Sequence, residues 1–270
     1  MALLRQTLAI AAACLSGAAA QYFDGYQNVS DATTPVQIRL AYQGPTAMEG
    51  KSSGVCILLF GKAKPLTCNF PVSWNTFSQL SNPSVQYGLS PNALTQTASS
   101  SESVTYPTSL TYNNHVNITG LQPFTTYYYL PQNSNATTPY SFTTARAAGD
   151  STPFTMGVVV DMGTFGVLGL SDHVGSGAAN PLRVNEQTTV AAMTQKLNDY
   201  EFMVHAGDIA YADYWLKEEI GGYLPNTTAQ GPLLYEQILN AFYDEVAPIT
   251  QAKPYMVNPG NHEGKHSLLC

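Results

Sequence analysis

The hydrophobic pattern of this 270-residue chain changes its period near the middle. From Pro35 to about Thr144, short segments such as VQIRLAY (36–42) alternate apolar and polar residues and are rich in β-branched and aromatic side chains. Short strands separated by Gly, Pro, Asn and Ser are typical of an all-β sandwich. The small, polar segment ARAAGDSTP (145–153) then predicts a linker and a domain boundary. We therefore expect a sandwich over residues 35–147.

Beyond the linker, longer apolar runs alternate with helical patterns. The runs FTMGVVV (154–160), EFMVHA (201–206) and PYMVN (254–258) predict buried strands, and residues 185–200 and 233–246 predict helices between them. The order strand–helix–strand–helix–strand indicates an α/β domain with a parallel sheet over residues 153–270. The expected fold class is an all-β sandwich followed by an α/β domain.

The N-terminal segment predicts a secreted glycoprotein. Residues 1–20 combine Arg5, an apolar run and three final alanines, which is typical of a cleaved secretory signal. Sequons for N-glycosylation follow, and we expect them in surface loops: Asn28, Asn117, Asn135 and Asn226. In an oxidising compartment Cys56 and Cys68 could form a disulfide.

Charge and hydropathy exclude two classes of partner. The net charge is −7 and Lys and Arg form no cluster, which argues against nucleic-acid binding. After the signal segment, no apolar run has the roughly 20 residues that a membrane span needs. We expect neither a nucleic acid nor a membrane as partner.

Polar side chains follow each of the three apolar runs beyond the linker. Asp161 follows the first run, Asp208 and Tyr211 follow the second, and Asn261 and His262 follow the third. The carboxyl ends of parallel strands meet at one edge of a sheet, where ligands bind. Two Asp, one Tyr, one Asn and one His converging there predict a metal site.

These motifs resemble those of the calcineurin-like metallophosphoesterases, and within them the purple acid phosphatases. The pairing of Gly163 in the first motif with Tyr211 in the second is similar to the purple acid phosphatase variant. The first domain, with VSWNT (72–76) and a Tyr after LQPFT (121–125), resembles the fibronectin type III-like domain of fungal and plant long-chain members. The resemblance covers about residues 35–263.

The resemblance implies a dinuclear metal centre that hydrolyses phosphate monoesters. Asp208 would bridge the two metals, and Asp161 and Tyr211 would bind Fe(III). Asn261 would bind a divalent metal, which is iron, zinc or manganese. His262 would hydrogen-bond to the phosphate or the leaving oxygen.

The sequence also departs from the family pattern. The family has three further His ligands, two of them in a Gly-His-x-His motif, and this sequence contains no His-x-His. We expect that the 270 residues as written do not hold a working dimetal centre. Residues 49–71 and 264–270 match nothing in the family, and each begins near a Gly-Lys pair. Our hypothesis is that both are translated introns.

Two alternatives to a secreted acid phosphatase remain open at this point. One is a catalytically inactive, truncated secreted fragment or binding module, favoured by the lacking His ligands. The other is a metallophosphoesterase acting on diesters or nucleotides, disfavoured by the combination of Tyr211 and Gly163. Trp74 and the tyrosines at 127–129 could form a sugar platform, although aromatic residues at strand spacing more often fill a core.

Overall fold

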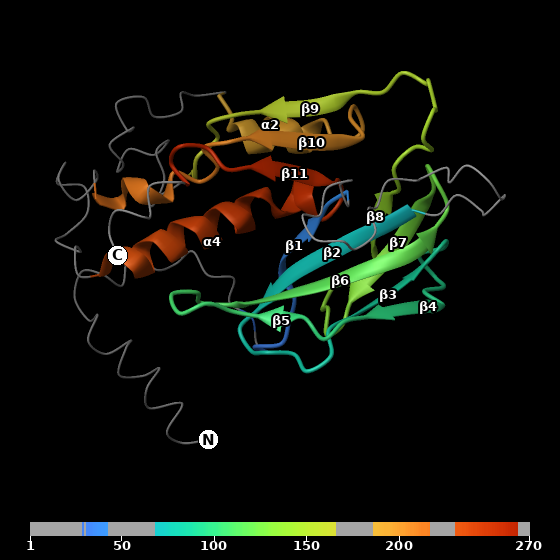
Figure 1. Cartoon of the computed structure of the whole chain (residues 1–270), viewed down its shortest axis with the longest axis horizontal. Helices are drawn as coiled ribbons and strands as arrows, with labels where there is room; N and C mark the ends of the chain where they lie inside the picture. Colours follow the sequence, from blue (N-terminus) through green and yellow to red (C-terminus); the bar gives the residue numbers. More distant parts are fainter. Residues whose placement is uncertain (1–28, 30, 43–67, 166–185, 217–229, 264–270) are drawn as a thin grey trace.

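The computed structural model describes residues 29, 31–42, 68–165, 186–216 and 230–263. Its first half is a sandwich of two four-stranded antiparallel sheets with strand orders β1-β2-β6-β5 and β4-β3-β7-β8 (Figure 1). The strands are β1 (Val36–Leu40), β2 (Cys68–Thr76), β3 (Ser84–Gly88), β4 (Gln96–Ser99), β5 (Ser103–Val104), β6 (Tyr112–Leu121), β7 (Thr126–Pro131) and β8 (Tyr140–Thr143). The all-β sandwich expected from the sequence is confirmed.

Aromatic rings from both sheets fill the sandwich. Trp74 and Tyr129 are fully buried, and the rings of Phe70 and Phe142 stack at 4.0 Å between their centroids. Tyr127 is also buried, and its hydroxyl accepts a hydrogen bond from the backbone N–H of Gln122 at 3.1 Å. That bond is the tyrosine corner expected from the turn before it. Trp74, Tyr127 and Tyr129 therefore form core and not a sugar platform.

The second strand of the sandwich begins earlier in the chain than expected. β2 starts at Cys68, where residues 49–71 were expected to be foreign to the fold. Phe70 pairs with Ile118 of β6 and is completely buried, so residues 68–71 contribute to the core. Residues 43–67 and 264–270 lie outside the described residues, as does Cys56. Cys68 itself is disulfide-bonded.

Two of the four sequons fall within the described residues. Asn135 is exposed in the connection between β7 and β8, as expected for a surface loop. Asn117 instead lies in β6 and is half-buried, so its expected place in a loop is wrong. Its segment alternates in the pattern of a strand, and strand pairing with β2 decided its position. Asn28 and Asn226 lie outside the described residues.

The second half contains a three-stranded parallel sheet of order β11-β10-β9. The elements of this second half are β9 (Met156–Val159), α2 (Thr189–Gln195), β10 (Phe202–Ala206), the 3-10 helix η2 (Ala212–Tyr214), α4 (Gly231–Thr250) and β11 (Tyr255–Asn258). The hydroxyl of Thr188 caps α2 by accepting from the N–H of Ala191, so this helix is shorter than the expected 185–200. α4 is longer than the expected 233–246.

The two faces of the parallel sheet differ. On one face, Met203 and His205 of β10 are completely buried, and the His205 ring lies 6.0 Å from Phe242 of α4. On the other face, Met156, Val158 and Val160 are 49%, 56% and 54% exposed. Within the described residues, this second face therefore carries apolar side chains that nothing covers.

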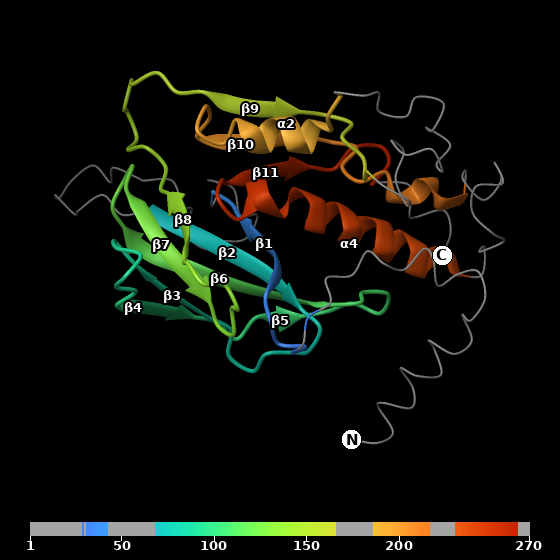
Figure 2. The same cartoon turned by 180° about the vertical axis from the view of Figure 1, so that it is seen from behind.

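α4 lies between the parallel sheet and the sandwich and packs on β1 (Figure 1 and Figure 2). A bulge in β1 places Gln37 in the left-handed region at φ 53°, and its amide donates to the Oδ1 of Asn240 at 3.1 Å. The hydroxyl of Thr250 donates to the carbonyl of Ile38 at 2.7 Å. These buried bonds join the two halves directly.

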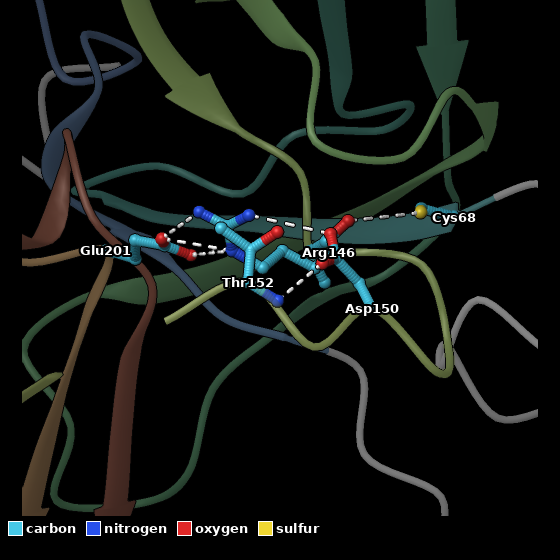
Figure 3. A network of polar contacts seen from close by, with 6 residues as sticks. Cys68, Arg146, Asp150, Thr152 and Glu201 are labelled. Atoms are coloured by element: carbon cyan, nitrogen blue, oxygen red, sulfur yellow. Dashed lines mark hydrogen bonds and ion pairs between the residues drawn. The ribbon is translucent and has the colours of Figure 1, made fainter. Parts of the chain in front are cut away.

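The linker is anchored to the second half by an ion pair. Arg146 contacts both carboxylate oxygens of Glu201 (Figure 3). Its guanidinium also lies 3.8 Å from the centroid of the Phe124 ring. Asp150 contacts the same guanidinium and accepts from the N–H of Thr152. None of the helices in the described part of the chain has both the length and the apolar content that a membrane span requires.

Candidate metal centre

The loops after β9 and β10 bring three of the expected ligands to one end of the sheet. Strand-like pairing continues past both strands, because the N–H of Gly163 donates to the carbonyl of Ile209 at 3.0 Å. Asp161, Asp208 and Tyr211 then adopt the left-handed region, with φ of 53°, 50° and 52°. Such backbone conformations cost energy for non-glycine residues and concentrate at functional sites.

Three oxygen-bearing side chains meet at this point. The phenol of Tyr211 donates a hydrogen bond to Oδ1 of Asp161 at 2.7 Å and lies 3.4 Å from Oδ2 of Asp208. Burial and the Asp161 carboxylate raise the pKa of the Tyr211 phenol far above its ordinary value. The phenol is therefore protonated unless a cation takes the place of its proton.

The loop after β11 closes onto Asp208. A Cβ on Gly260 would overlap the backbone nitrogen and Oδ1 of Asp208, so this approach requires glycine. Two residues later, the N–H of His262 donates to Oδ1 of Asp208 at 3.0 Å. That bond is the main cause of the lowered pKa of Asp208, which keeps the group a carboxylate. Asn261, between Gly260 and His262, is exposed.

The partner of His262, Asp213, was not expected from the sequence. Nδ1 of the ring lies 2.9 Å from both carboxylate oxygens of Asp213, which η2 carries two residues after Tyr211. The rings of Tyr211 and Tyr214 lie 4.3 and 4.9 Å from the imidazole. A His held this way has a fixed orientation and directs Nε2 away from the carboxylate. The signal available in the sequence was an Asp spaced two residues from an expected ligand.

Glu263 ties two of the loops together and was likewise missed. Its Oε1 accepts from the N–H of Ile209 at 2.7 Å, and its Oε2 accepts from the N–H of Gly260 at 2.8 Å. His205 of β10 is fully buried, and its Nδ1 lies 2.5 Å from the hydroxyl of Tyr255.

The side chains at this point supply some of the oxygen ligands that a hard cation needs. Among the described residues, no three His, Cys, Asp or Glu side chains gather as a metal site. Binding at this point therefore depends on the Tyr211 phenolate and the Asn261 amide joining Asp161 and Asp208. Carboxylate and phenolate oxygens are hard anionic ligands that suit a trivalent ion. Within the described part of the chain, Asp161, Asp208 and Tyr211 meet as the expected trivalent position requires, whereas Asp208 and Asn261 are the expected ligands that the divalent position has there.

Comparison with known proteins gives one family and several relatives. Residues 69–144, which span β2 to β8, match the family model for the purple acid phosphatase N-terminal domain. Acid phosphatase A of Cryphonectria parasitica is 38% identical over 87% of this chain, and an acid phosphatase of Aspergillus ficuum is 28% identical over 58% of it. The chain covers 42% and 30% of these two proteins, so it spans less than half their length.

A solved structure shares the fold. A purple acid phosphatase from yellow lupin seeds matches 86% of this chain with a TM-score of 0.51 and 20% sequence identity. The chain covers 36% of that structure. The match extends beyond the sandwich, because β1 to β8 make up much less than 86% of the chain.

Proposed function

We propose that this protein is a secreted purple acid phosphatase acting on phosphate monoesters. The family model over residues 69–144 and the 38% identical acid phosphatase support the family assignment, and the lupin purple acid phosphatase shares the fold. The family implies a dinuclear metal centre. The observation that carries the proposal is the convergence of Tyr211 with Asp161 and Asp208 where β9 and β10 end. Secretion and glycosylation are supported by the signal-like segment and the sequons.

In this proposal each strand end supplies part of the metal centre. Asp161 and Tyr211 would hold Fe(III), Asp208 would bridge to a divalent ion (iron, zinc or manganese), and Asn261 would bind that second ion. When bound, the pair supplies a water of lowered pKa and a clamp for the phosphoryl oxygens. The protonated phenol of Tyr211 must lose its proton to Asp161 or solvent before it can bind.

His262 would act on the substrate as a proton donor. Asp213 holds Nδ1, and the flanking tyrosine rings limit rotation of the imidazole. Nε2 is then the nitrogen available to hydrogen-bond to the phosphate or to protonate the leaving oxygen. Asp213 holds the imidazole in one orientation, as a carboxylate beside a catalytic His does elsewhere.

The test is metal content measured beside hydrolysis of p-nitrophenyl phosphate at acid pH. It uses protein secreted from the spliced transcript, whose sequence also decides whether residues 49–71 and 264–270 are retained. We expect bound iron and turnover, both lost in Asp208→Ala, with Asp199→Ala as control because Asp199 is an exposed carboxylate. An active Asp208→Ala protein that keeps its iron would contradict the bridging role.

The visible absorption spectrum of a variant tests which residues bind the iron, without a measurement of activity. Tyr211→Phe should remove the visible tyrosinate-to-iron absorption band, because Tyr211 is the phenol that contacts Asp161 and Asp208. Tyr214→Phe is the matched control, since its ring neighbours His262 without carrying an expected ligand. A band that survives in Tyr211→Phe would assign the iron to other residues.

A folded, secreted protein without metal and without turnover would contradict the proposal.

A further inference from the structure

A cavity of about 300 Å³, lined by both polar and apolar side chains, lies where the sandwich meets α4. Its walls come from β1, β2, residues 104–113 and α4, and it shares no residue with the candidate metal centre. The volume is at the lower end of the range for small-molecule sites, roughly 300–1,000 Å³.

One wall offers hydrogen-bond donors. Nη2 of Arg39 and Nδ2 of Asn113 both donate to Oδ1 of Asn75, at 2.8 and 3.1 Å. Each of these nitrogens carries a second hydrogen. In the part of the chain that the structure describes, no carboxylate pairs with Arg39, whose guanidinium lies 4.7 Å from the centroid of the Tyr243 ring.

Segment 105–111 of the lining offers acceptors. The hydroxyl of Thr105 donates to the carbonyl of Thr111 at 2.8 Å, so it presents its lone pairs to a ligand. The hydroxyl of Ser109 donates to the same carbonyl at 2.9 Å and accepts from the N–H of Thr111 at 3.3 Å, which leaves it one lone pair for a ligand. The Tyr106 hydroxyl donates to Oε2 of Glu236 at 2.8 Å, and this adds a carboxylate to the same part of the lining.

The hydrogen-bond donors and acceptors together determine which class of ligand fits the cavity. A free anion in the cavity would meet Glu236, and a free cation would meet Arg39. A neutral molecule whose hydroxyl groups both donate and accept satisfies both walls. The Tyr106 ring, with the residue 51% exposed, adds a surface for C–H groups. We propose that this cavity binds a single neutral sugar unit.

The test is binding of methyl glycosides of glucose, galactose, mannose and N-acetylglucosamine, measured by ligand-observed NMR and calorimetry on the whole chain. We expect saturable millimolar binding of at least one glycoside. Ser109→Ala should weaken that binding about fivefold, the effect of one hydrogen bond. Thr97→Ala is the matched control, because Thr97 is exposed on β4 of the other sheet.

Glu236→Gln provides a second variant that keeps the shape of the wall, and thermal unfolding checks that both variants are folded. The absence of saturable glycoside binding would overturn the proposal, as would binding that neither variant changes. Inorganic phosphate is the anionic probe: phosphate binding that Ser109→Ala weakens, without glycoside binding, would make the cavity an anion site and overturn the proposal. Because the glycosides carry no phosphate, these outcomes are independent of the phosphatase proposal.

Discussion

The two halves of the molecule bury their apolar side chains in different ways. In the sandwich, two sheets face each other, and valines such as Val72 and Val116 are completely buried. In the parallel sheet, α4 covers one face, while Val158 on the other face is 56% exposed. The same residue type thus contributes core in one half and open surface in the other. The sandwich closes its own core, whereas the second half depends on what packs against it.

Deleting a ring from the sandwich core should have the largest effect. Phe142 stacks on Phe70 and contacts Tyr127 and Tyr129, so Phe142→Ala should cost about 3–5 kcal/mol in the free energy of unfolding. Val158→Ala on the open face should cost under about 1 kcal/mol. Urea unfolding followed by tryptophan fluorescence measures both. Equal losses would mean that the open face is covered in solution.

The contact between the halves can be separated from their cores. Trp74 reports on the sandwich and Trp215 on the second half, and these are the two tryptophans of the sequence. Thr250→Val leaves the buried carbonyl of Ile38 without its donor, which should cost about 1–2 kcal/mol. Thr194→Val on α2 is the control, since its hydroxyl bonds only within its helix.

Single-tryptophan versions of each variant, made with Trp→Phe, show where the loss occurs. We expect Thr250→Val to lower the transition seen by Trp215 and to leave the one seen by Trp74. If both transitions shift together, the two halves unfold as one unit. The difference in how they bury their apolar side chains would then not make them differ in stability.

Asp244 should make the second half lose stability as pH rises through the mildly acid range. Burial raises the pKa of Asp244 on α4 to about 6, and its Oδ1 finds no hydrogen-bond partner among the described residues. Between about pH 4 and 6 the folded state therefore binds more protons than the unfolded state, so this group's contribution falls as pH rises through that window. Asp244→Asn should stabilise the protein by on the order of 1 kcal/mol at pH 7 and by little at pH 4.

The measurement for Asp244 is the pH dependence of urea unfolding followed at Trp215. Asp199→Asn is the control, since Asp199 is an exposed carboxylate. A gain of the same size at pH 4 and pH 7 would contradict the assignment of the pH dependence to Asp244.

The smallest effect is expected at the linker. Glu201 is part-exposed, and both of its carboxylate oxygens accept hydrogen bonds from Arg146. Glu201→Gln should therefore lower the free energy of unfolding by about 0.5–1 kcal/mol in low salt and by less in high salt. Asp199→Asn again serves as control, since it pairs only with the exposed Lys196. The readout is thermal unfolding at two salt concentrations. A loss independent of salt would mean that the linker is held by packing on Phe124 instead.

Local patterns were enough to predict most of the elements and part of the site. Alternation predicted the sandwich, and the turn before Tyr127 predicted its tyrosine corner. The motifs after three strands predicted that Asp161, Asp208 and Tyr211 would meet, because parallel strands end at one edge. These features depend on residues close together in the chain or on a general rule of topology.

Contacts between distant segments could not be predicted in this way. The sequence carries no period that pairs Phe70 with Ile118, so residues 68–71 were assigned to a foreign segment although they are buried core. Asp213 contacts His262 across 49 residues of sequence, and Gln37 contacts Asn240 across 203 residues. Both contacts depend on how distant loops and helices pack together. The sequence by itself determined which short segments form strands and which polar groups end them, because those depend on local spacing. Tertiary packing alone decided which side chains those groups contact and which sheet face stays open, because burial is a property of the assembled surfaces.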